Sequence, residues 1–251
     1  MHGTARLGHN RRFGAGNASS AGDGPWNRGE RALGASIMAK KATGKPRRVV
    51  YSVHPSVAYW QAIVANLPQK TGRSLDEWLA LIKKQGLIGE AEQLKWLKGE
   101  HGLGGTTAGL IAESAQGKNR QTTDGGAYLK AAGGYVEDMY QDAKTALRPI
   151  HDALIDLVCS MGEDIKICPC TTIVPLYRNH VIAQIKPATR TRIDFGLALK
   201  GAKKKLPKRL IDTGGLKKGD RITHRFPITS ETEIDAEVRD WVKVAYDLDG
   251  P

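Results

Sequence analysis

Residues 171–200, TTIVPLYRNHVIAQIKPATRTRIDFGLALK, decide the fold class, because they are the one long run that has the pattern of several adjacent β-strands. Near the end of this run, apolar residues alternate with polar or small ones, at Ile193, Phe195, Leu197 and Leu199. A period of two is typical of a strand with one apolar and one open face. Shorter runs of the same kind precede it, around 173–177 and 181–185.

The links between these runs predict how the strands pair. Arg178-Asn179-His180 and the Pro187-Ala188 pair are short connections. Short links favour antiparallel neighbours, because parallel strands need a long crossover. With a last alternating run over 222–228, we predict a mainly antiparallel sheet of about four strands. Gly196 and Ala198 would leave room on its open face for a close approach, although a flat, solvated face is the simpler interpretation.

Helical patterns flank the strands on both sides. The stretch 135–161 has helical spacing, and Pro149 divides it into two helices. Ser230-Glu-Thr-Glu233 fits a capping box before a final helix that carries Trp241. We therefore predict an α+β domain over residues 133–251, with helices packed on one face of the sheet.

The preceding residues predict a separate, all-helical domain over 51–115. Ser52 or His54 can cap a first helix that begins at Pro55, and Ser74-Leu-Asp-Glu77 is a capping box for another. Residues 116–132 are polar and Gly-bearing, as in a linker.

The first fifty residues have no periodicity and few large apolar side chains, which predicts a disordered basic tail over 1–50. Within it, Met38 opens the sequence MAKKATGKPRR, and we expect translation to begin there.

Composition restricts the class of protein. The chain has 251 residues, of which 40% are hydrophobic and 25% charged. No apolar run approaches the roughly 20 residues of a membrane span, and there is no signal peptide pattern. Three cysteines without an export signal favour the cytoplasm and free thiols. Cys168-Pro169-Cys170 lacks the spacing and the second pair of a zinc site, so we expect no metal and no other cofactor.

The net charge of +12 is unevenly distributed. It is concentrated in the first fifty residues and in the loop 200–218, which has eight basic residues against Asp212. Such segments attract phosphate backbones, although they are also common as hydrated, solubilising loops. The loop contributes candidate phosphate contacts at Lys203, Lys204, Lys205, Lys208 and Arg209.

A glycine-rich turn between two short helices is the second phosphate candidate. Gly102, Gly104, Gly105 and Thr106 form a pattern like a helix-hairpin-helix. Glycines leave backbone N–H groups open to a phosphate, and the start of the next helix favours an anion. The alternative is a tight turn in which Thr106 is simply the N-cap.

Two stretches of the chain resemble known families. Residues 54–112, with SLDEWLALIKKQGL and LKWLKGEHGLGGTTAGLIA, resemble domain-of-unknown-function family 4287. Residues 135–249, with LRPIHDAL, TRIDFGLALKG, THRFPITS and EIDAEVRDWVKVAYD, resemble family 5655. The resemblance implies a bacterial protein in which these two domains follow each other, and such proteins usually begin close to the first domain. It implies no activity. The GGTT turn departs from the His-bearing version frequent in the first family.

No usual catalytic pattern is present: there is no G-x-S-x-G elbow, no Walker-type loop and no H-E-x-x-H, so we predict no catalytic residue. Two binding hypotheses follow. The first is weak, sequence-independent nucleic-acid binding through the glycine turn and the basic segments. The second is a small-molecule or anion site on the open sheet face near Arg192 and Arg225, where salt pairing with Asp194 is the simpler account.

Overall fold

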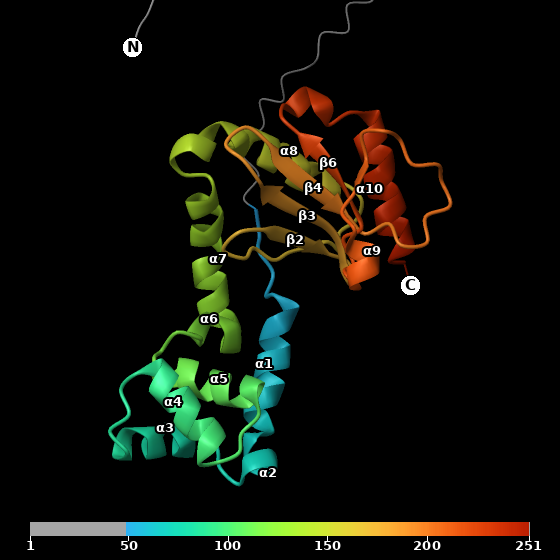
Figure 1. Ribbon diagram of the computed structural model, residues 1–251. Coiled ribbons are helices and arrows are strands. Elements are labelled where there is room, and N and C mark those ends of the chain that lie inside the picture. Colours follow the sequence, from blue (N-terminus) through green and yellow to red (C-terminus); the bar gives the residue numbers. More distant parts are fainter. Residues whose placement is uncertain (1–48, 251) are drawn as a thin grey trace, which may run out of the picture. The chain divides into compact units, whose positions relative to one another are not determined.

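The computed structural model describes residues 49–250 (Figure 1). The predicted tail and the predicted start at Met38 therefore fall outside the described residues, apart from Val49 and Val50. Within the described part of the chain, no helix is long and apolar enough to cross a membrane.

The first half is helical, as predicted. Five helices follow one another: α1 (Pro55–Ala65), α2 (Leu67–Thr71), α3 (Leu75–Lys84), α4 (Glu90–Gly99) and α5 (Gly105–Ala115). Trp78, Leu97 and Ile111 are fully buried in a core formed by α2–α5. Two predicted caps are confirmed: His54 Nδ1 accepts from the Ser56 N–H, and Ser74 and Glu77 form the capping box of α3.

The stretch predicted as a linker is mostly helical. It contains α6 (Arg120–Thr123) and the first half of α7 (Gly125–Met139). Asp124 caps α7 by accepting from the N–H groups of Gly126 and Ala127. The glycines made this stretch resemble a linker, but α7 has an apolar stripe. Its buried residues recur at helical spacing on both sides of residue 133: Tyr128, Ala132, Val136 and Met139.

The predicted division near Pro149 is present, but the chain changes direction earlier. A 3₁₀ helix, η1 (Asp142–Leu147), separates α7 from α8 (Arg148–Cys159). Pro149 is the second residue of α8, where a missing N–H costs nothing.

The sheet is antiparallel throughout and has six strands in the order β1-β2-β3-β4-β6-β5. The four predicted strands are present as β2 (Val174–Tyr177), β3 (Val181–Pro187), β4 (Ile193–Leu197) and β6 (His224–Ile228). Two-residue strands, β1 (Lys166–Ile167) and β5 (Ile211–Asp212), add an edge on each side. Two residues are too short to show a period, which is why the sequence pattern missed them.

Helices α8 and α10 (Ala236–Leu248) cover one face of the sheet, as Figure 1 shows. Phe195, Phe226 and Trp241 belong to the shared core. The predicted capping box at Ser230 is wrong. Residues Glu231–Glu233 form a short 3₁₀ turn, η2, and Asp235 caps α10 by accepting from the Val238 N–H at 3.0 Å.

Candidate ligand-binding site

A chain segment lies across the open face of the sheet at Gly196. The segment 219–222 connects the one-turn helix α9 (Gly215–Lys218) to β6. A Cβ at position 196 would lie only 2.5 Å from Cγ2 of Ile222. Glycine is therefore what allows the segment to pack against the strand, and the close approach that the sequence suggested is made by the chain itself.

Arg221 is held in place by a nearly buried carboxylate. The side chain of Asp249 is 5% exposed and accepts from the backbone N–H groups of Asn179 and His180, at 2.9 and 2.7 Å. Its other oxygen contacts His180 Nδ1 and Arg221 Nη2, each at 2.9 Å. Burial raises the pKa of Asp249, but the hydrogen bonds from His180 and the Arg221 charge outweigh it, so that this pKa lies below its ordinary value. Asp249 therefore remains an anion whose acceptor positions are occupied.

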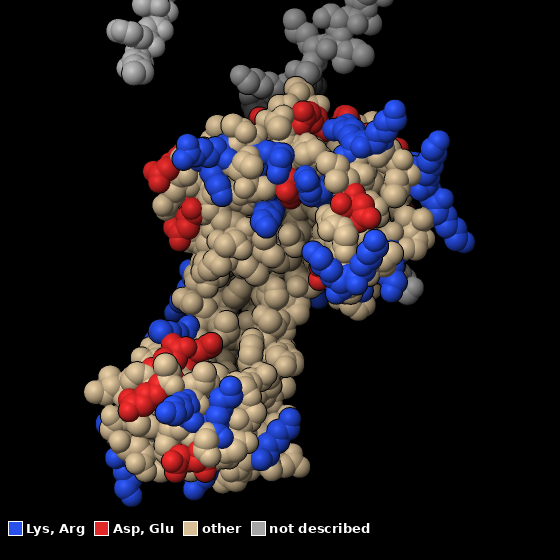
Figure 2. Space-filling model, in the orientation of Figure 1, with Lys and Arg blue, Asp and Glu red and all other residues tan. Residues whose placement is uncertain are grey.

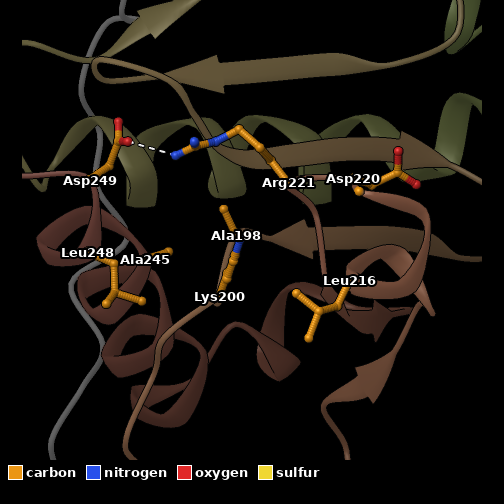
Figure 3. Close-up of a pocket in the computed structure, with 9 residues that line it drawn as sticks. Ala198, Lys200, Leu216, Asp220, Arg221, Ala245, Leu248 and Asp249 are labelled. Carbon is orange, nitrogen blue, oxygen red and sulfur yellow. Dashed lines mark hydrogen bonds and ion pairs between the residues drawn. The ribbon is translucent and has the colours of Figure 1, made fainter.

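A hollow of about 350 Å³ lies beside this ion pair (Figure 3). Leu216 and Leu248 lie on opposite sides of it, and Lys200 lies between them. Arg221 and Asp220 line it as well. The hollow thus has apolar walls, two cationic side chains and two carboxylates, Asp220 and Asp249.

A second hollow, of about 470 Å³, lies on the open face of the sheet and shares Asp220 and Arg221 with the first. Lys186 and Arg225 also line it, from β3 and β6. Cationic side chains thus outnumber acidic ones around the hollow, although Asp194 is part of its lining. Figure 2 shows Lys and Arg side chains over the sheet domain, with Asp and Glu among them.

The predicted small-ligand residues do lie together. Arg192 Nε and Arg225 Nη1 both contact Asp194 Oδ1, at 2.9 and 2.8 Å. The Arg225–Asp194 pair is the cross-strand salt pairing of the simpler interpretation, and the Arg192–Asp194 pair is local. Arg225 also lines the second hollow, whereas Arg192 does not. Their role in binding a ligand stays a prediction.

The predicted phosphate turn connects α4 to α5. Gly102 has a φ of +62°, and the N-cap of α5 is Gly104, with no side-chain cap. Thr106 therefore lies inside the first turn and is not the N-cap. The Lys98 ammonium lies 3.9 Å from where a Cβ on Gly105 would be, so a cation accompanies these open N–H groups.

Some basic side chains of the loop 200–218 form ion pairs, and others are exposed and form none within residues 49–250. Arg209 binds Asp235 and donates to the Glu233 carbonyl at 2.8 Å. Lys204 lies 3.7 Å from Asp240 and over the ring of Trp241. Three exposed lysines form no ion pair within the described residues: Lys203, Lys205 and Lys208.

The Cys-Pro-Cys segment lies beside a cluster of aromatic rings. The Tyr128 hydroxyl donates to the Pro169 carbonyl at 2.8 Å, and Tyr177 contacts His54 at 3.2 Å. Burial raises the pKa of Cys168 to about 12 and also raises that of Cys170, so both thiols are protonated at neutral pH. No group of three potential metal-binding side chains occurs in residues 49–250.

Sequence reasoning missed most of the residues around the first hollow. Lys200 was included only as part of a basic loop, and Leu216, Arg221, Leu248 and Asp249 were not singled out. They come from the segment after β4, from α9 and the segment after it, and from the end of α10, and no short motif joins them. The clue in the sequence is Gly196, because a glycine on the open face of a strand permits a close neighbour, here Ile222, which follows Arg221.

The comparisons identify two families. Residues 60–116 match the Domain of unknown function (DUF4287), and residues 136–249 match the Domain of unknown function (DUF5655). The chain thus carries these two domains in tandem, as the resemblance indicated. A search of the curated proteins and of the solved structures found no match.

Proposed function

We propose that the C-terminal domain is a binding module for a small anionic molecule, which it holds beside Arg221. The observation that carries the proposal is the position of this guanidinium between two adjoining hollows. One of its nitrogens is fixed by Asp249, and an arginine has five N–H donors, so most remain for a ligand. Lys200 and Arg225 add positive charge on either side.

The electrostatics also support an anion. Asp249 is satisfied by its own donors and does not need a ligand cation. Lys200 and Lys186 are exposed and form no ion pair within residues 49–250. Hollows of 300–1,000 Å³ with a few convergent polar groups are the usual form of small-molecule sites.

Thermal unfolding of the full chain with a panel of small anions tests this function. A ligand that binds only the folded protein at about 100 times its Kd adds about 2.7 kcal/mol to the unfolding free energy. We expect Lys200→Gln and Arg221→Gln to reduce the rise in melting temperature. Arg190→Gln is the matched control, because Arg190 is exposed and lines neither hollow. If no anion stabilises the protein, or if all three variants respond like the wild type, the proposal is wrong.

A second candidate function is weak nucleic-acid binding, favoured by the Lys98 ammonium at the glycine turn and by the three open lysines of the loop. Titration of a labelled DNA duplex at several salt concentrations tests it. Replacing Lys203, Lys205 and Lys208 by Gln should reduce the salt slope by about 2–3, because each phosphate contact adds about 0.9. Gly104→Leu should weaken binding and leave the fold intact, since nothing lies within 4 Å of a Cβ there. Absence of binding at low salt would exclude this function.

A further inference from the structure

Two large apolar side chains of the first hollow are unusually exposed. Leu216 is 58% exposed and Leu248 is 43% exposed, and they lie on opposite sides of the hollow (Figure 3). Ala198 and Ala245 complete the apolar part of the lining. An apolar group placed between the two leucines would remove part of their exposed surface from water, which is favourable in proportion to the area buried.

The polar part of the lining has two cations, Lys200 and Arg221, and two carboxylates, Asp220 and Asp249. Lys200 has no ion-pair partner in residues 49–250, and Arg221 keeps donors beyond the one bound to Asp249. The remaining carboxylate, Asp220, lies on the α9 side, away from Asp249 (Figure 3). An anionic head would therefore meet the ammonium of Lys200, unpaired within the described residues, and the remaining N–H donors of Arg221, whose charge already balances that of Asp249.

We infer that the ligand is an amphipathic anion: a small molecule with a carboxylate or phosphate head and a short hydrocarbon body. The head binds Lys200 and Arg221, and the body lies between Leu216 and Leu248. This inference rests on the proposed function, since it names the class of anion that the same site takes. The volume of about 350 Å³ is at the small end for ligand sites, which favours a short body.

A series of straight-chain carboxylates from acetate to octanoate, titrated into the full chain by calorimetry, tests the inference. Inorganic phosphate serves as a head without a body. Each CH₂ that the hollow buries should tighten binding about fourfold, until the hollow is full. Lys200→Gln should weaken every member of the series by a similar factor, because it acts on the head.

The two leucines identify where the hydrocarbon lies. Leu216→Ser and Leu248→Ser should both reduce the gain per CH₂ along the series. Leu206→Ser is the matched control, because Leu206 is 42% exposed in the same loop and does not line the hollow. All three side chains are exposed, and a melting curve of each variant confirms its fold before the titration.

The outcomes separate the inference from the proposed function. A gain per CH₂ that Leu216→Ser and Leu248→Ser reduce, and Leu206→Ser does not, supports both. Equal affinity for acetate, phosphate and octanoate would overturn the amphipathic ligand and leave anion binding intact. A gain that persists in both lining variants would place the hydrocarbon elsewhere and also overturn it. Failure of every anion to bind would overturn the proposed function itself.

Discussion

Single residues of the site differ in how far the sequence could place them. Asp194 and Arg225 could be grouped in advance, because they lie on neighbouring strands whose alternation was visible, and Arg192 lies two residues before Asp194. Asp249 could not, since its donors come from positions 179, 180 and 221 and only the folded chain brings them together. From the sequence alone, Asp249 at the end of the last helix resembles an exposed, solvated carboxylate.

His151 gives a prediction at the same scale. It is 3% exposed, and its Nδ1 lies 3.0 Å from the Tyr140 hydroxyl. Burial, and then the nearby Arg148 charge, lower its pKa to about 3. Between pH 6.5 and pH 3, His151 is therefore protonated in the unfolded chain and neutral in the folded protein. The unfolding free energy falls as the pH falls through this range. We expect this residue to remove about 2 kcal/mol of unfolding free energy between pH 6 and pH 4.

Urea unfolding of the wild type and His151→Asn at several pH values measures this contribution. The Asn side chain can accept the Tyr140 hydrogen bond but does not titrate, so its stability should depend less steeply on pH. Other titrating groups are common to both proteins and cancel in the comparison. Parallel curves for the two proteins would show that His151 does not resist protonation.

The helices and strands show which sequence patterns are sufficient to locate an element. Alternation over five to seven residues located β3, β4 and β6, because burial of one face imposes a period of two. The Ser230 capping box failed because the motif constrains only four residues, and Asp235 offers α10 a competing cap. In α7 the glycines suggested a linker, although Tyr128 and Ala132 bury its face.

The contact between β4 and the segment 219–222 carries a prediction at this scale. Gly196→Ala should destabilise the protein by about 1–3 kcal/mol, because the added methyl group collides with Ile222. The same change made together with Ile222→Ala should cost much less, since the colliding Cγ2 is then absent. A double-mutant cycle by urea unfolding gives this coupling directly. Equal costs in the two backgrounds would mean that Ile222 is not what requires glycine at position 196.

At the scale of the whole molecule, the sequence suggested two domains joined by a linker, with a boundary at residue 133. Both families are present, but α7 runs across that boundary. The segment before α1 also contributes to the C-terminal core. The Ser52 N–H donates to the Ile167 carbonyl at 2.8 Å, and Val49 and Tyr51 pack against the core. Sequence composition could not reveal these contacts, because the short extended segment before α1 has no pattern that distinguishes it from the disordered tail predicted before it.

Tyr51 tests whether this segment is an integral part of the fold. It packs against the C-terminal core and against the cluster of Val57, Tyr128 and Ala132, and burial raises its pKa. Tyr51→Ala in the full chain should lower the unfolding free energy by about 2 kcal/mol, less than the 3–5 of a fully buried ring. Tyr59→Ala is the matched control: Tyr59 is 59% exposed, and its loss should change stability by less than about 0.5 kcal/mol. Similar small losses for both variants, measured by urea unfolding, would mean that the C-terminal core is complete without residues 49–54.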